Sequence, residues 1–303
     1  MERQWSGRTD GGTRMQRWLI AMLRWTDVRV VYFFMAFVIP FYMIFNRQGY
    51  RSMRQYFEHR GNHGNALRPV KHHGLKTLWH IYRNHYVFGQ VIIDRFAVYA
   101  GRKFQFVEDG KEQVDACFSE PGGFLILSSH TGNYELAGCT LSSGEKRVHA
   151  LVYAGETETI MKNRDRVLGG HSTDMIPVMN DMSHIFLMNA AIDNGDVVSM
   201  PADRLLGSKK SFPCRFMGED AKLPAGPFVF AAQKEVPVFA AFVMKQRATR
   251  YHLIVRRLDG NLQSPTSVRL RAADLAKNYA EVLEEVMEQY PYQWFNYFDF
   301  WNQ

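Results

Sequence analysis

Apolar and polar positions follow two rhythms along this chain, one typical of buried strands and one typical of amphipathic helices. Compact apolar runs between turn residues predict strands, which lie at 103–107, 124–129, 148–153, 175–178, 196–200, 237–244 and 251–258. Apolar residues three and four positions apart predict helices, which lie at 71–100, 133–141, 157–168, 182–193 and 267–290. Because strands and helices take turns, we expect an α/β fold with a mixed, largely parallel central sheet flanked by helices.

The stretch from Val30 to Phe45 holds sixteen residues without a charge. A helix of this length spans about 24 Å, less than the roughly 30 Å of a bilayer's hydrocarbon core, and Pro40 would kink it. Arginines flank the stretch on both sides, so charge gives it no orientation across a membrane; they are Arg14, Arg17, Arg24, Arg29, Arg47, Arg51 and Arg54. We expect a helix that lies in one leaflet or at the interface, with an ordinary buried helix as the alternative.

The region 48–70 is polar and rich in His, Asn and Gly, which predicts a connection with a short helix at 51–60. The chain is therefore expected to divide into two parts. Residues 1–70 form a membrane-associating helix and its polar connection, and residues 71–303 form a single α/β domain.

The formal net charge of +7 and the pI of about 9.3 favour an anionic partner, such as acidic lipid headgroups, phosphorylated substrates, an acidic carrier protein or nucleic acid. The basic residues are dispersed and form no recognition motif, so we do not expect nucleic acid. Three widely spaced cysteines predict a reducing compartment. No P-loop, strand-linked GxGxxG, GxSxG or metal-ligand spacing occurs, so we expect neither a cofactor nor a metal.

Two predicted strands end in polar residues with chemical potential. His130 follows the strand at 124–129, and Asp203 and Arg204 follow the strand at 196–200. The carboxyl ends of parallel strands meet at one edge of a sheet, where ligands gather. Glu135 lies five residues after His130, and Gly132 permits a close turn that brings its carboxylate back to the imidazole.

A carboxylate on one ring nitrogen of His130 would fix the tautomer and make the other nitrogen a stronger base. The imidazole would then take a proton from a hydroxyl or amine that attacks a thioester, with nearby backbone N–H groups stabilising the oxyanion. A structural histidine beside a solvated Glu135 is the alternative, because this spacing also arises by chance.

The segment SSHTGNYELAG resembles the His-x4-Asp/Glu signature of the glycerolipid acyltransferase superfamily, and more closely that of the bacterial lipid A late acyltransferases. Tyr134 stands where those enzymes usually have Trp. Later blocks are similar as well, in the same order over residues 70–300: VVSMPADRLLGSKKS, FPCRFMGEDAKLPAGPFVFAAQKEVPV and YPYQWFNYFDFW. The Asp203–Arg204 turn departs from the usual Asp-Gln-Asp and resembles that of glycerophosphate acyltransferases, which leaves the acceptor open.

The resemblance implies a glycerolipid acyltransferase-like fold and acyl transfer at the cytoplasmic face of the bacterial inner membrane, peripherally or through one helix. The donor would be acyl carrier protein or acyl-CoA as a thioester co-substrate. The acceptor would be a membrane lipid: a lipid A precursor, a lysophospholipid, an aminolipid or a polyene lipid. His130 and Glu135 are the expected catalytic pair. Substrate contacts are expected from Asp203, Arg204, Arg164, Lys209 and Lys210. The alternative function is a non-catalytic lipid-binding protein of the same fold.

Overall fold

A seven-stranded sheet forms the centre of the computed structural model, which describes residues 13–62, 74–139, 146–153, 173–178, 181–205, 210–258 and 267–302. Its strands are β1 (Gln105–Asp109), β2 (Phe124–Ser128), β3 (Val148–Tyr153), β4 (Thr173–Val178), β5 (Val197–Pro201), β8 (Val238–Arg247) and β9 (Arg250–Arg257). They lie in the order β1-β9-β8-β2-β5-β3-β4. Neighbours run parallel except in the β8–β9 pair, which confirms the predicted fold class.

Strand β2 is buried on both faces because helices cover both sides of the sheet. Successive strand residues point to opposite faces, and accordingly Phe124 and Ile126 join one apolar cluster while Leu125 and Leu127 join another. Helix α5 (Lys111–Ser119) belongs to the first cluster. The second cluster contains α7 (Ser183–Asp193), α8 (Ala225–Lys234) and α9 (Val268–Gln289). This double burial explains why the run reads as continuously apolar in the sequence.

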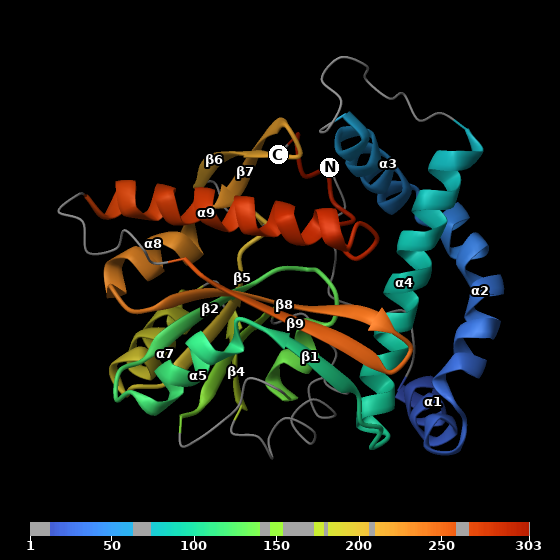
Figure 1. Ribbon diagram of the computed structural model, residues 1–303, viewed down its shortest axis with the longest axis horizontal. Coiled ribbons are helices and arrows are strands. Elements are labelled where there is room, and N and C mark those ends of the chain that lie inside the picture. The colour runs from blue at the N-terminus through green and yellow to red at the C-terminus, as the bar shows by residue number, and fades with distance from the viewer. Residues whose placement is uncertain are drawn as a thin grey trace.

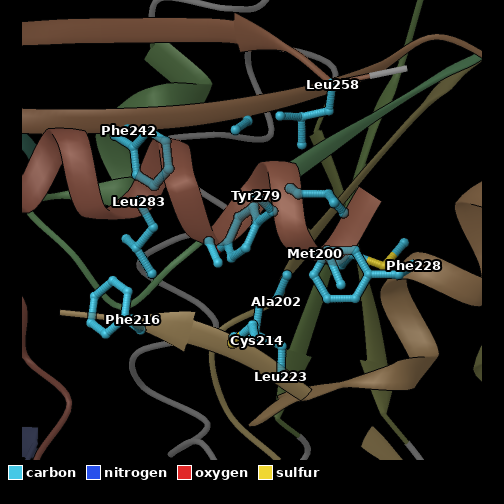
Figure 2. Packing of buried hydrophobic residues seen from close by; sticks show 14 of the residues in the cluster. Met200, Ala202, Cys214, Phe216, Leu223, Phe228, Phe242, Leu258, Tyr279 and Leu283 are labelled. Carbon is cyan, nitrogen blue, oxygen red and sulfur yellow. The ribbon is translucent and has the colours of Figure 1, made fainter. Parts of the chain in front are cut away.

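Helix α9 runs across the sheet, and a separate antiparallel hairpin of β6 (Ser211–Phe216) and β7 (Glu219–Pro224) packs on it (Figure 1). Figure 2 shows Tyr279 and Leu283 of α9 in one apolar cluster with side chains of the hairpin and of the β5 end. The Tyr279 hydroxyl also donates a hydrogen bond to the Ser128 carbonyl at 2.7 Å. The hairpin was not predicted, because each of its strands has only six residues and neither forms a compact apolar run.

Four helices build the other end of the molecule: α1 (Thr13–Trp25), α2 (Val28–Phe45), α3 (Arg47–Asn62) and α4 (Leu75–Tyr99). Helix α2 lies along the outer side of α4 (Figure 1). Four of its residues are buried: Val28, Tyr32, Ile39 and Met43. Val31 and Met35 are half-buried, and its other large apolar side chains are exposed: Val30, Phe33, Phe34, Phe37, Val38, Phe41, Tyr42, Ile44 and Phe45. Within the described part of the chain, α2 alone is long and apolar enough to cross a membrane.

Several sequence-based boundaries differ from the structure. The short helix expected at 51–60 is the longer α3, and the helix expected at 133–141 is a 3-10 helix, η1 (Tyr134–Cys139). The helix expected at 157–168 lies outside the described residues, as does the division between the two parts at residue 70. That division stays a prediction, although α2 and α3 share their apolar core with the sheet and α9.

Candidate active site

Strands β2 and β5 are neighbours, and their carboxyl ends bring His130 and Asp203 together. Ser128 pairs with Pro201 in the parallel register, so both site residues stand two positions beyond the same rung of the ladder. The His130 imidazole Nδ1 lies 2.7 Å from Asp203 Oδ1, and the His130 backbone N–H donates to Asp203 Oδ2 at 3.0 Å. The two strand ends therefore lie together as predicted, and the Asp203 carboxylate contacts both the ring and the backbone N–H of His130.

Asp203 is fully buried and accepts a third hydrogen bond, from the indole Nε1 of Trp294 at 3.2 Å. Burial by itself would raise the pKa of this carboxyl. The charge of His130 and its hydrogen bonds outweigh burial, so the pKa of Asp203 falls to about 2. Asp203 is consequently an ionised carboxylate at neutral pH.

This ionisation determines the tautomer of His130. An ionised carboxylate has no proton to donate, so the proton in the Nδ1···Oδ1 hydrogen bond belongs to the imidazole. In the neutral ring Nε2 then carries the lone pair that can accept a proton. The His130 side chain keeps 21% of its surface exposed, whereas that of Asp203 keeps none. The pair is thus arranged as an accessible base with a buried partner.

The loop after His130 is held between β8 and the C-terminal tail. Gly132 N donates to Gln293 O at 2.9 Å, Asn133 N donates to Val243 O at 2.7 Å, and Phe295 N donates to His130 O at 2.8 Å. Gly132 has a φ of +49°, and a Cβ there would lie 2.1 Å from Val243 O. The turn therefore requires glycine for both conformation and space.

Glu135 is the second residue of η1 and contacts α4. Its Oε2 lies 3.0 Å from Arg95 Nε and accepts a hydrogen bond from the Tyr99 hydroxyl at 3.0 Å. The carboxylate is buried, and these contacts join the loop after His130 to α4. The carboxylate that accepts the hydrogen bond from the His130 ring belongs to Asp203, and the role of Glu135 as the orienting carboxylate stays a prediction.

Arg204 follows Asp203 and extends along the C-terminal tail. Its Nη2 donates to Phe295 O at 2.8 Å, and its guanidinium lies 4.7 Å from the centre of the Phe298 ring. Nε has no hydrogen-bond partner among the described residues. Burial lowers the pKa of Arg204, while the neighbouring carboxylate of Asp203 opposes that change. A cation with unused hydrogen-bonding capacity thus stands beside the His130–Asp203 pair.

Of the remaining predicted substrate residues, only Lys210 lies within the described part of the chain. Arg164 and Lys209 lie outside the described residues, and Lys210 is exposed just before β6. Within the described ranges, no group of three or more His, Cys, Asp or Glu side chains is placed to hold a metal ion. Cys117 and Cys214 are buried, and Cys214 is a free thiol.

Three residues of this site were missed as polar partners: Trp294, Arg95 and Tyr99. In the sequence, Trp294 lies in the last block of the family resemblance, and only the structure shows that its indole reaches Asp203. Arg95 and Tyr99 are spaced one helical turn apart on α4, which places both on one face. No signal in the sequence tells that this face meets η1.

The comparisons with known proteins bear on the same region. The family model for bacterial lipid A biosynthesis acyltransferases matches residues 92–302, a range that holds His130, Glu135, Asp203, Arg204 and Trp294. A search of curated proteins found no match. The family match covers more than half of the chain and includes both strand ends of the site. The chain therefore belongs to the bacterial lipid A biosynthesis acyltransferase family.

Proposed function

We propose that this protein moves a fatty acyl chain from a thioester donor to a hydroxyl or amine of an amphipathic lipid at the cytoplasmic face of the inner membrane. The observation that carries the proposal is the His130–Asp203 pair at the carboxyl edge of the sheet, within a chain of this acyltransferase family. No cofactor takes part, since the thioester itself supplies the activated acyl group.

In the proposed reaction His130 Nε2 takes the proton from the acceptor's hydroxyl as its oxygen attacks the thioester carbonyl carbon. A tetrahedral oxyanion forms, the carbon–sulfur bond breaks, and the imidazolium returns the proton to the departing thiolate. The products are an ester, or an amide from an amine acceptor, and a free thiol. Asp203 keeps its negative charge throughout and stabilises the transient imidazolium.

Backbone N–H groups near His130 were expected to stabilise the oxyanion. Those of His130, Gly132 and Asn133 already donate to Asp203, Gln293 and Val243 respectively. We therefore assign the oxyanion, or a phosphate of a substrate, to the guanidinium of Arg204. Its partly buried position strengthens its interaction with a developing negative charge.

Glu135 is proposed to hold the His130 loop against α4 through Arg95 and Tyr99. The competing assignment makes Glu135 the carboxylate that orients the imidazole. The two assignments differ in the variant that loses catalysis while keeping its fold: Asp203→Asn under the first, and Glu135→Gln under the second.

The donor is proposed to be acyl carrier protein, with acyl-CoA as the alternative thioester. Lys209, Lys210 and Arg164 are proposed contacts for an acidic carrier or its phosphopantetheine, and the exposed apolar face of α2 supports a location at the membrane. A non-catalytic lipid-binding protein of the same fold is the alternative function. It predicts that His130 is dispensable.

The test is a comparison of lipid extracts by mass spectrometry from cells with the gene, without it, and complemented by His130→Ala. We expect a lipid product that disappears on deletion and is not restored by this variant. A matched control is His149→Ala, because His149 Nε2 also lies 3.1 Å from a carboxylate, that of Asp196, away from the described site. His149→Ala should restore the product. Full restoration by His130→Ala would support the non-catalytic alternative.

A further inference from the structure

Three arginines form a row on the first turns of α3, immediately after the apolar helix α2. Arg47, Arg51 and Arg54 stand four and three residues apart, a spacing that puts them on one helical face. All three side chains are exposed. Together with Met43 and Tyr50 they line a cavity of about 310 Å³. The lining of the cavity therefore combines two apolar side chains with three guanidinium groups.

Two of these arginines form no ion pair with a carboxylate in the described part of the chain. Arg54 Nε lies 2.8 Å from Glu58 Oε1, so part of its charge is used within α3. Arg47 and Arg51 have no ion pair within the described residues. Arginine presents its N–H donors in a planar fork that matches the oxygens of a phosphate. The row thus offers two guanidinium groups for an external anion.

Along the chain, the exposed apolar residues of α2 end two positions before this row. Phe37, Phe41 and Ile44 are 62%, 65% and 65% exposed, and Phe45, two residues before Arg47, is 83% exposed. An apolar surface that ends in arginines fits the boundary between acyl chains and phosphate groups of a bilayer. An acidic protein or a nucleic acid would match the charge but leave the aromatic face of α2 in water.

The attachment of α2 to the rest of the protein determines how it can meet a membrane. Its buried stripe packs on α4, and the Tyr32 hydroxyl donates a hydrogen bond to the buried carboxylate of Asp94. A helix that left α4 to span the bilayer would strip Asp94 of this donor and expose the stripe. We therefore expect α2 to stay docked on α4 when the protein binds a membrane, so that α2 lies in the surface of one leaflet and α3 lies at the level of the headgroups.

We propose that Arg47 and Arg51, with Arg54, form a binding site for the phosphate of an anionic phospholipid in the membrane on which α2 rests. The inference builds on the membrane location given under the proposed function. The bound lipid would fix the rotation of α2 in the interface, because apolar side chains enter the acyl layer only when the arginine row faces the phosphates.

The experiment measures binding of the purified full-length protein to vesicles by sedimentation. One set of vesicles is phosphatidylcholine alone, and the other is phosphatidylcholine mixed with phosphatidylglycerol. The test variant is Arg47→Gln with Arg51→Gln. The control variant is Arg269→Gln with Lys277→Gln, which removes the same charge from exposed positions of α9.

We expect the phosphatidylglycerol vesicles to bind the wild-type protein more tightly, and added salt to weaken this preference. The test variant should lose about 30-fold in affinity for these vesicles, because each basic residue near an anionic surface contributes about 1 kcal/mol, which is about fivefold in affinity. Its binding to phosphatidylcholine alone should change little, and the control variant should bind both sets like the wild-type protein.

The outcomes separate the two proposals. If the wild-type protein binds neither set, the membrane location is wrong and the lipid site falls with it. If it binds the anionic vesicles and the test variant binds them as well as the control variant, the location stands and the phosphate site is wrong. A test variant that binds vesicles normally but loses affinity for acyl carrier protein would overturn the lipid assignment and give the row to the donor.

Discussion

At the residue scale, the His130 imidazole contacts a carboxylate that comes from a different strand. Asp203 accepts hydrogen bonds from both the ring and the backbone N–H of His130, so it fixes the position and the tautomer of the imidazole together. The Trp294 indole holds Asp203 from the other side. A change at Asp203 should therefore act on chemistry more than on substrate binding.

Asp203→Asn should lower kcat by about 10³-fold or more, with a smaller change in KM, because an amide can donate to Nδ1 and favour the wrong tautomer. Steady-state kinetics on an acyl carrier protein thioester would measure this. A thermal melt should show that the variant folds, and Glu135→Gln provides the comparison. If Glu135→Gln causes the larger loss of kcat and Asp203→Asn remains active, Glu135 is the partner of His130.

The low pKa of Asp203 also predicts a pH dependence of stability. The value is about 2 in the folded protein and 3.8 as the ordinary value, so the folded state favours the ionised form. The resulting stabilisation, on the order of 2 kcal/mol, is complete above pH about 4 and is lost as the pH falls towards 2. Urea unfolding of wild-type and Asp203→Asn proteins should show a gap in free energy that narrows over this range. A gap that is constant between pH 5 and pH 2 would contradict the assignment.

At the scale of elements, a buried ion pair joins the N-terminal helices to the sheet. Asp94 of α4 contacts Lys245 of β8 and accepts hydrogen bonds from Tyr32 of α2 and Tyr251 of β9. Burial raises the pKa of Asp94 and lowers that of Lys245, while the attraction between the two charges opposes both shifts. The Tyr251 hydroxyl also accepts from the Asn133 side chain at 3.4 Å, which links this cluster to the loop after His130.

Lys245→Met should reduce the free energy of unfolding by about 3–5 kcal/mol, because it leaves the buried Asp94 carboxylate without its cation. Adding Asp94→Asn should recover much of this loss, since the double variant buries no net charge. Urea denaturation of the two single variants and the double variant measures the coupling. Additive losses would show that the two charges do not stabilise each other.

At the scale of the whole molecule, the packing of α2 on α4 decides which of its apolar residues meet solvent. The exposed aromatic side chains do not pack in the protein core, so they are accessible to a membrane. Truncating the N-terminal helices would be a poor test of this face, because it would also uncover α4 residues that pack against α1 and α2, such as Ile93 and Phe96.

Substitution of Phe33, Phe37 and Phe41 by Ser is the sharper test. These side chains are 60%, 62% and 65% exposed, so the melting temperature in detergent should fall little. Sedimentation with cell membranes should drop at least tenfold, since each buried Phe contributes about 1.5–3 kcal/mol. Ile39→Ser, at a buried position of the same helix, should have the opposite profile and mainly reduce stability. Equal sedimentation of wild-type and triple-variant proteins would show that α2 does not contact the membrane.

The fold class could be predicted from the sequence, because the apolar periodicities of strands and helices are local properties that do not depend on tertiary contacts. The sequence by itself also determined that His130, Asp203 and Arg204 stand at strand ends, where a parallel sheet collects its site residues. Because the carboxyl ends of parallel strands share one edge of the sheet, the position of these residues in the sequence is enough to make them site candidates. Helix 133–141 was misread as an ordinary helix because a 3-10 turn and an α-helical turn share similar residue preferences.

Which carboxylate contacts the His130 imidazole depends on tertiary packing and could not be predicted from the sequence. Glu135 is five residues from His130 along the chain, yet its described contacts are with Arg95 and Tyr99, because Gly132 and the bond from Asn133 to β8 direct η1 towards α4. Asp203 is 73 residues away and meets His130 because β2 and β5 are neighbours in the sheet. Strand order depends on long-range packing that local periodicity does not encode. The exposed face of α2 likewise depends on tertiary packing, because α4 covers the opposite face of the helix.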